Sequence, residues 1–350
     1  MLRFVSSPNM LKKWQDILRL LGMFNAPKLW NLLLVQSSYL FARITHKPRI
    51  LGLPLSMSVE PTTSCNLRCP ECVSGLQAFK RPTGMLDPTF YQLKIDKWKK
   101  HLVYLTLYFQ GEPYLHPQFF DLVQYASSRK IYTSTSTNAH FLNPENAKAT
   151  VISGLHRLIV SLDGTTQATY EKYRIGGKMN SVLEGIKTLV ESKRKLNSKT
   201  PYIILQFIVF RTNENEVEAV KRLGKDLGVD SVQIKTAQLT DYKMGNPLMP
   251  ENAKYSRYKK MQDGTYEIKS KYSNRCWRMW HAAVMSWDGQ MLPCCFDKNA
   301  EYEMGNLKHQ TLREIWNNPI YSKFRQKLFS NRKSIDICQN CTEGLKVWSS

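Results

Sequence analysis

The sequence predicts an α/β fold, because strand-like and helix-like segments alternate through its central part. Leu55, Met57 and Val59 alternate with polar neighbours, as the residues of a half-buried strand do. Five more strand-like segments follow, at Leu102–Phe109, Lys130–Asn138, Arg157–Leu162, Tyr202–Phe210 and Ser231–Thr236. The helix-like segments between them are Pro88–Lys100, Gln118–Arg129, Pro144–Ser153, Ser181–Lys195 and Glu214–Leu227. Six parallel βα units with right-handed crossovers predict a partial (β/α)6 barrel of the TIM type.

An N-terminal helical extension, residues 1–50, precedes the barrel. Leu11, Trp14, Leu18 and their apolar neighbours recur at helical spacing, with Lys12 and Lys13 among them. A second, more apolar stretch runs from Leu29 to Phe41. Two interpretations remain open: a pair of helices packed on the main domain, or a basic amphipathic surface that contacts a membrane or a partner.

The rest of the chain divides into three parts. Residues 51–240 hold the predicted barrel, and residues 241–275, rich in Lys, Tyr, Asn and Pro, are predicted to be a linker. Residues 276–350 are predicted to form a small α+β module with short strands around cysteines, and a helix-like segment from Thr311 to about Phe329. The 350 residues suffice for these parts at roughly 150 residues per domain.

The composition limits the class of protein. Apolar residues are 42% and charged residues 22%, which is compatible with a packed core. No run of 18 apolar residues and no secretory signal pattern occurs, so we expect a cytoplasmic protein. The net charge of +22 suggests nucleic acid, anionic lipid or an acidic substrate as a partner, or simply a solvated basic surface.

Eight cysteines stand in tight clusters, which favours metal sites over a disulfide scaffold. The first cluster, Cys65-x3-Cys69-x2-Cys72, directly follows the first predicted strand. In a parallel βα barrel this loop lies at the C-terminal mouth, where active sites are built. Three thiolates can hold three irons of a cubane and leave the fourth iron open, much as catalytic zinc sites keep an open position.

This cluster resembles that of the radical S-adenosylmethionine (SAM) superfamily. The resemblance implies a SAM-binding [4Fe-4S] cluster on Cys65, Cys69 and Cys72, which are the catalytic and metal-binding residues. It also implies reductive cleavage of SAM to a 5′-deoxyadenosyl radical that abstracts hydrogen from a substrate. Without the resemblance, a zinc knuckle or a reactive-thiol loop would fit the same cysteine spacing.

The resemblance extends to the residues that would contact SAM. The segment Gly111-Glu112-Pro113 is similar to the "GGE" element of the family, with Gln110 in place of its first glycine. In similar enzymes an arginine near this point of the chain pairs with the SAM carboxylate, and the resemblance implies that role for Arg174. Polar strand ends could also bind SAM or could merely cap the following helices. These candidates are Ser134, Ser136, Asn138, Ser161 and Asp163.

The C-terminal cysteines resemble those of the SPASM domain, an accessory iron-sulfur module of radical SAM enzymes. With five cysteines instead of seven, the short form implies one auxiliary cluster. Its expected ligands are Cys276, Cys294, Cys338 and Cys341, with Cys295 able to replace Cys294. A four-thiolate zinc site would fit this spacing as well.

The function predicted from these features is radical SAM chemistry on an unidentified substrate. The reaction would be an oxidation, a cross-link or a maturation of a peptide or of a small anionic metabolite. We expect an electron donor such as flavodoxin or ferredoxin, no nucleic-acid partner, and peripheral membrane contact through the N-terminal extension. The alternative is a zinc-stabilised basic RNA-binding protein without radical chemistry, which explains the charge and the cysteines but not the six βα units.

Overall fold

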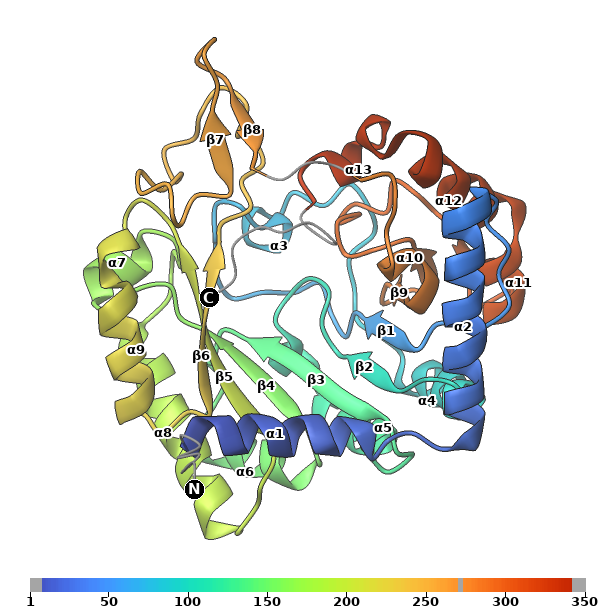
Figure 1. The fold of residues 1–350 in the computed structure, drawn as a ribbon. Helices are drawn as coiled ribbons and strands as arrows, with labels where there is room; N and C mark the ends of the chain where they lie inside the picture. The colour runs from blue at the N-terminus through green and yellow to red at the C-terminus, as the bar shows by residue number, and fades with distance from the viewer. Residues whose placement is uncertain (1–7, 270–272, 342–350) are drawn as a thin grey trace, which may run out of the picture.

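The fold is a half-open barrel with a second module joined to its first strand (Figure 1). The computed structural model describes residues 8–269 and 273–341. Among these residues, nine strands form one sheet in the order β11-β10-β9-β1-β2-β3-β4-β5-β6, and β7 and β8 form a separate pair. Parts of the predicted extension, linker and C-terminal module, namely residues 1–7, 270–272 and 342–350, lie outside the described residues.

Six parallel strands make the barrel, and they confirm the predicted fold class. Every pair from β1·β2 to β5·β6 is parallel and joins neighbours in the sequence. The strands are β1 (Ser56–Val59), β2 (Tyr104–Thr106), β3 (Tyr132–Thr137), β4 (Arg157–Ser161), β5 (Tyr202–Val209) and β6 (Ser231–Thr236). Because all six point the same way, their C-terminal ends meet at one mouth.

The crossover helices begin where the sequence supplies capping side chains. Asp87 accepts a hydrogen bond from the Phe90 backbone at 2.6 Å, and Asn143 accepts one from Asn146 at 2.8 Å. A proline follows each cap at the first helical position, where its missing N–H costs nothing. The helices are α3 (Val73–Leu76), α4 (Pro88–Trp98), α5 (Phe119–Ser127), α6 (Pro144–Ile152), α7 (Gln167–Glu171), α8 (Met179–Lys195) and α9 (Val217–Asp226), with 3-10 turns η1 (Pro113–Leu115) and η2 (Glu214–Glu216).

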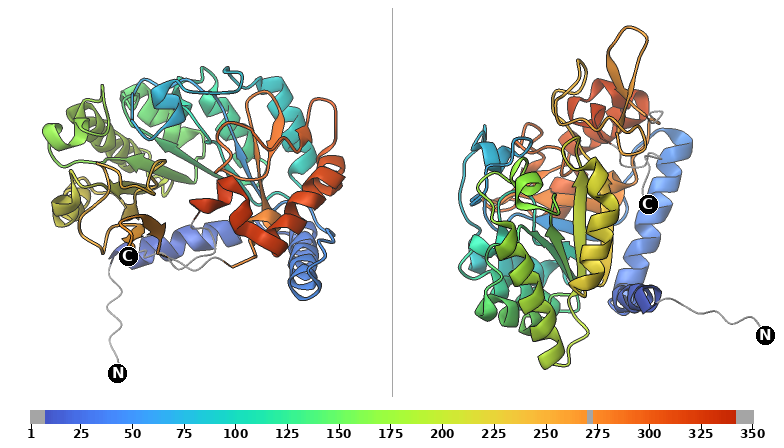
Figure 2. Two further views of the ribbon diagram at one scale, coloured as in Figure 1. Left: turned by 90° about the horizontal axis from the view of Figure 1, so that it is seen from above. Right: turned by 90° about the vertical axis from the view of Figure 1, so that its left-hand side faces the viewer.

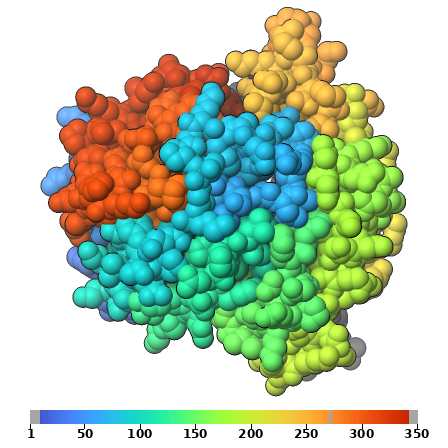
Figure 3. All heavy atoms as spheres, turned by 180° about the vertical axis from the view of Figure 1, so that it is seen from behind, coloured from blue at the N-terminus to red at the C-terminus, as the bar shows by residue number. Residues whose placement is uncertain are grey.

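The C-terminal module continues the barrel sheet. Strand β9 (Ala282–Met285) pairs in parallel with β1, and β10 (Gln290–Leu292) and β11 (Gly305–Asn306) extend it in antiparallel fashion. Short helix α10 (Arg278–His281) leads into β9. From behind, the segment after β1 (light blue) lies between this module (orange and red) and the later barrel units (green) (Figure 3). The pairing of β1 with β9 joins the barrel to the module.

The predicted helix from Thr311 to about Phe329 is two helices, which corrects that part of the prediction. Helix α11 (Leu312–Asn317) ends before Asn318, and α12 (Pro319–Asn331) begins after it. Asn318 has an extended backbone (φ −70°, ψ 163°), because the residue before a proline avoids the helical region. Its side chain then caps α12 by accepting from Tyr321 at 2.8 Å. The chain continues through η3 (Arg332–Ser334) and α13 (Asp336–Gln339).

Two helices form the N-terminal extension, α1 (Pro8–Leu21) and α2 (Ala26–Thr45). Helix α1 crosses the strand N-termini, where its buried Asp16 pairs with Arg157 at the start of β4. Helix α2 packs on the C-terminal module, where Tyr39 contacts the ring of Trp280 at 5.3 Å between centroids. Both helices lie along the same side of the molecule (Figure 2). The packed inner faces agree with the first interpretation of the extension.

Residues 241–275, predicted as a linker, hold the hairpin of β7 (Tyr258–Lys260) and β8 (Tyr266–Ile268). The hairpin packs on the cysteine-bearing side of the barrel mouth, because Tyr258 and Ile268 share an apolar cluster with Leu67 and Cys69. Among the described residues, we find no helix whose length and apolar character would let it cross a bilayer.

Candidate functional site

The first cysteine cluster opens onto a cavity at the barrel mouth. Cys65, Cys69 and Cys72 follow β1 and all line one cavity of about 420 Å³. The cavity is bordered by the ends of several strands, as the barrel topology requires. The sequence expectation that the three thiols face a common space at the mouth therefore agrees with the geometry.

Two contacts close the loop that carries these cysteines. The buried Glu60 forms a bidentate ion pair with Arg81, with N–O distances of 2.6 and 2.9 Å. Thr63 and Gly84 exchange hydrogen bonds, with the Gly84 N–H donating to the Thr63 hydroxyl at 2.9 Å. Arg81 also donates to the carbonyl of Lys298 at 3.0 Å, so the same guanidinium ties the loop to the C-terminal module. The loop is thus held at both ends before any ligand binds.

The cysteine side chains lie in a poorly solvated environment. Burial raises the pKa of Cys65 to about 11 and also raises the pKa of Cys69, although the guanidinium of Arg174 opposes the second shift. Arg174 Nη1 lies 3.9 Å from the Cys69 Sγ. Thiolates, not thiols, bind metal. A positively charged metal cluster would supply the charge that keeps these thiols ionised.

Gly111 brings the backbone close to the cysteine loop. Its φ is +74°, and a Cβ added to it would lie 2.3 Å from the Thr62 carbonyl oxygen and 2.8 Å from that of Ser64. Its N–H donates to the Ser74 hydroxyl at 2.8 Å. Only glycine fits such a conformation and such an approach without strain. Any larger side chain at this position would therefore fill the space between Gly111 and the cysteine loop.

Glu112 lines the cavity and is buried, and its carboxylate already has three donors. It accepts from the Thr137 hydroxyl at 2.7 Å and from the backbone of Asn138 at 2.8 Å and Tyr114 at 3.2 Å. Burial raises the pKa of Glu112 to about 7 despite these donors. The neighbouring Pro113 is buried and begins η1 without lining the cavity.

The polar strand ends divide into cavity-lining and supporting residues. Ser134, Ser136, Asn138 and Ser161 line the cavity, whereas Asp163 does not. The fully buried Asp163 accepts from Arg174 at 2.6 and 2.7 Å and from the Ile208 backbone at 2.7 Å. Arg174 itself lines the cavity. Asp163 therefore positions Arg174, a role that the sequence alone did not distinguish from ligand contact.

Several cavity residues were not predicted. Lys298 reaches the cavity from the C-terminal module, and it forms no ion pair with any residue that the structure describes. Alternation along the second strand could have indicated Tyr104, Thr106 and Tyr108, because side chains two apart share one face. Gln238 is a further polar addition, and the cavity is also lined by Gln206 and by Gln110, which replaces the first glycine of the GGE-like element.

The C-terminal cysteines surround a second, much smaller cavity. Cys276, Cys294, Cys338 and Cys341 all line it, together with apolar side chains such as Phe324. Its polar lining beyond the thiols comes from arginines, and Arg332 Nη2 lies 3.4 Å from the Cys341 Sγ. Burial raises the pKa of Cys338 to about 12. The site is a dry pocket with four thiols from three separate segments.

Cys295 follows Cys294 directly but faces away from the second cavity. It packs with Phe109, Val284 and Leu292 in a separate apolar cluster and does not line the second cavity. Among the described residues, no group of three His, Cys, Asp or Glu side chains is close enough to hold a single metal ion. All eight cysteines are free thiols.

Comparison with family models accounts for both cysteine regions. Residues 59–224 match the radical SAM superfamily, and residues 276–342 match the SPASM iron-sulfur cluster-binding domain. The first match includes all residues that line the first cavity except Gln238 and Lys298, and the second match includes the whole lining of the second cavity. They give no support to the zinc-stabilised RNA-binding alternative.

Two curated relatives are similar over most of their length. One is the tungsten-containing aldehyde ferredoxin oxidoreductase cofactor-modifying protein of Pyrococcus furiosus, 25% identical over 76% of this chain and 82% of its own. The other is the PqqA peptide cyclase of Gluconobacter oxydans, 25% identical over 84% of each chain. The solved structure of Streptococcus suis SuiB bound to S-adenosylmethionine shares the fold, with a TM-score of 0.61, 13% identity and coverage of 87% of this chain and 75% of that one.

Proposed function

The chain belongs to the radical SAM enzymes that carry a C-terminal SPASM domain, and from this premise we propose that Cys65, Cys69 and Cys72 hold the SAM-binding [4Fe-4S] cluster. When bound, the cluster and SAM supply a reductive cleavage that yields a 5′-deoxyadenosyl radical for hydrogen abstraction from the substrate. The observation that carries the assignment is the convergence of the three thiols on the cavity that Gly111 and Glu112 also line. The domain division at residues 50, 240 and 275 is part of this proposal.

The chain's own residues have distinct roles in this proposal. Gly111 lets the backbone approach the methionine part of SAM, and the carboxylate of Glu112 attracts its ammonium group. Arg174, held by Asp163, is aimed at the SAM carboxylate through a planar guanidinium. Ser134, Ser136, Asn138 and Ser161 offer hydrogen bonds to the nucleoside. The apolar cluster around Leu67 and Phe210 limits the access of water to the thiols.

We assign the auxiliary cluster to Cys276, Cys294, Cys338 and Cys341. Four thiolates would ligate all four irons of the auxiliary cluster, so none of its irons would be open to SAM. Cys295 is excluded from the ligand set because it packs in a different cluster. The auxiliary cluster would then accept an electron from the product radical or brace the module on the barrel.

The substrate is proposed to be a peptide or a small anionic metabolite. One relative is named as a peptide cyclase, which supports the peptide class, and another as a cofactor-modifying protein, which supports a small molecule without indicating its charge. The anionic class is favoured by Lys298, which lines the first cavity without an ion pair among the described residues. A substrate panel of different charge, scored by SAM cleavage, tests this: equal stimulation by neutral compounds would remove the anionic class.

The cellular setting is also a proposal. We place the enzyme in the cytoplasm, where thiols stay reduced, with a flavodoxin or a ferredoxin as electron donor. We further propose that α1 and α2 contact a membrane surface. The support for this contact is the set of large apolar side chains that both helices expose.

Anaerobic incubation with SAM and dithionite tests the function. The protein should be brown, should contain about seven to eight irons per chain, and should release 5′-deoxyadenosine. Cys69→Ala should abolish this product, whereas Cys295→Ala, a thiol outside both proposed ligand sets, should not. A colourless zinc protein that leaves SAM intact would contradict the proposal.

A further inference from the structure

Helix α1 exposes a continuous apolar stripe on its outer face. Its inner face is fixed to the barrel by the buried Asp16, which accepts from Arg157 and Tyr132. At 3.6 residues per turn, the outward side chains recur on a single face. The stripe consists of Met10, Leu11, Trp14, Leu18 and Leu21, and Trp14 is 57% exposed.

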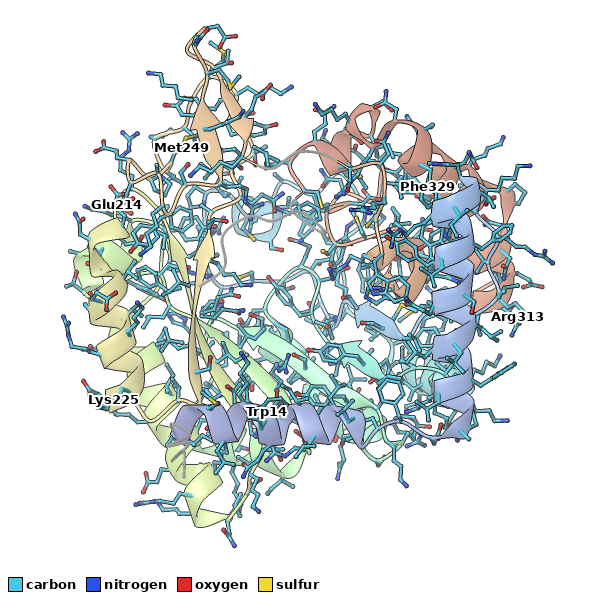
Figure 4. All side chains as sticks on the ribbon, in the orientation of Figure 1. Trp14, Glu214, Lys225, Met249, Arg313 and Phe329 are labelled. Atoms are coloured by element: carbon cyan, nitrogen blue, oxygen red, sulfur yellow. The ribbon has the colours of Figure 1, made fainter. Side chains whose placement is uncertain are left out.

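Helix α2 repeats this arrangement. Its inner face buries Val35 and Ala42 against the body of the protein, and its end packs on Phe329 through a His46 ring contact (Figure 4). Its outer stripe consists of Leu29, Trp30, Leu33, Leu40, Phe41 and Ile44, and Ile44 is 80% exposed. Of the 21 large apolar residues exposed in the described part of the chain, eleven lie on these two helices. Figure 4 labels Trp14 on α1.

The charge on this side of the molecule is almost entirely positive. Residues 8–50 contain seven lysines and arginines, of which Lys28 is buried, and one acidic residue, Asp16, which is buried and paired. Lys13 and Arg19 lie on the two shoulders of the α1 stripe at helical spacing. Apolar stripes flanked by basic side chains are complementary to an anionic bilayer surface. A second copy of this chain would instead bring like charges together.

A basic cavity of about 280 Å³ lies beside α1, at the end of the barrel opposite to the cysteine mouth. It is formed by α1, the end of α8 and the start of β5. Asp230 forms ion pairs with both Lys12 and Lys193, at 2.9 and 2.8 Å, and its single charge balances one of them. Three further cations line the cavity, and none forms an ion pair with a described residue; they are Arg19, Arg194 and Lys199.

We infer that this cavity binds the headgroup phosphate of an anionic phospholipid while the stripes of α1 and α2 lie in the bilayer surface. Guanidinium groups suit the phosphate oxygens, and the three unpaired cations exceed the charge that Asp230 can neutralise. The headgroup site rests on the proposed membrane contact. It does not depend on the radical chemistry, because the cavity lies at the far end of the strands.

Flotation of the purified full chain with vesicles tests both parts. The protein should float with phosphatidylcholine vesicles that contain phosphatidylglycerol and should remain behind with phosphatidylcholine alone. Trp14→Glu with Trp30→Glu should lower the partition by more than about tenfold, since both charges would enter the interface. The matched control Ile152→Glu, at a position 57% exposed on α6, should leave it unchanged.

The cavity is tested by Arg19→Ala with Arg194→Ala. The partition should fall about 25-fold, about fivefold for each basic side chain lost at an anionic surface. The double variant Lys97→Ala with Lys148→Ala removes equal charge from other exposed sites and should change it much less. If the stripe variants weaken binding but the double arginine variant and the double lysine variant behave alike, the membrane contact stands and the headgroup site is wrong.

Other outcomes overturn the inference as well. Binding of inorganic phosphate in the cavity without flotation would identify a free anion as the ligand. A wild-type dimer that Trp14→Glu dissociates would identify a second copy as the occupant of the stripes. Release of 5′-deoxyadenosine should be the same in all these variants, so failure of the lipid site and failure of the radical chemistry give different results.

Discussion

The two cysteine sites differ in how the chain builds them. The first takes three thiols from one loop of eight residues, Cys65 to Cys72, and faces a cavity of about 420 Å³ lined with polar side chains. The second takes four thiols from three segments and encloses a small apolar space. An open, polar site leaves room for a ligand at the metal, whereas a closed, dry one fills its coordination from the protein. The contrast favours the proposed chemistry at the first site and electron transfer or bracing at the second.

The largest expected effect is a difference in SAM cleavage between variants of the first site and variants of the second. Cys72→Ala should abolish SAM cleavage, because the first cluster would lose a ligand. Cys338→Ala should retain cleavage within about tenfold, because its thiol lines a different cavity. The amount of 5′-deoxyadenosine that each variant releases in the presence of dithionite measures this difference. Loss of cleavage in a well-folded Cys338→Ala protein would show that the two sites do not act separately.

Iron content sharpens the ligand set of the second site. Cys294→Ser should lower iron by about four atoms per chain, the content of one cubane. Cys295→Ser should keep all the iron, because Cys295 packs against Phe109 and Leu292 outside the cavity. Iron and sulfide analysis of the two variants decides whether Cys294 or Cys295 is the ligand. The reverse result would move the ligand to Cys295.

Gly111→Ala tests the close approach at the first site. The added Cβ would meet the Thr62 carbonyl oxygen at 2.3 Å, so the backbone must shift. We expect kcat/KM for SAM to fall about 100-fold, the effect of a displacement near 1 Å. Gly264→Ala is the control, because Gly264 also has a positive φ but nothing within 4 Å of its added Cβ. Equal losses in both variants would attribute the effect to φ alone.

The smallest expected effect is a pH dependence at the first site. Burial raises the pKa of Glu112 to about 7, so its carboxyl is neutral below that pH and ionised above it. SAM binding should therefore tighten as the pH rises from 6 to 8, by up to about tenfold for an interaction near 1.4 kcal/mol. Equilibrium binding of SAM to the unreduced enzyme across this pH range measures the dependence. In Glu112→Gln the profile should be flat, and an unchanged slope would reject this carboxylate as the cause.

The barrel could be predicted from sequence because its signals are local. Five of the six strands show their own apolar pattern, and β3 is instead rich in threonine, which also favours strands. Helix caps such as Asp87 and Asn143 precede prolines. The break between α11 and α12 was missed because the apolar period continues across Asn318 and Pro319. The pairing of β9 with β1 was also unforeseen, since strands far apart in sequence carry no mark of their partner.

The site was predictable where its residues share one loop. The three N-terminal cysteines needed only spacing, and Gly111 followed from a second short motif after the next strand. Lys298 and the separation of Cys294 from Cys295 depend on how the C-terminal module folds onto the barrel, which spacing cannot show. Asp163 was predicted at the site, but its pairing with Arg174 gives it a supporting position behind the cavity wall.

Electron paramagnetic resonance of the reduced clusters, with and without SAM, tests most directly whether only the first site is open. One variant would carry Cys276→Ser with Cys294→Ser to keep the first cluster alone, and another would carry Cys65→Ala with Cys69→Ala to keep the second alone. SAM should change the spectrum of the first variant and leave that of the second unchanged. A spectrum that responds to SAM only in the second variant would contradict the assignment.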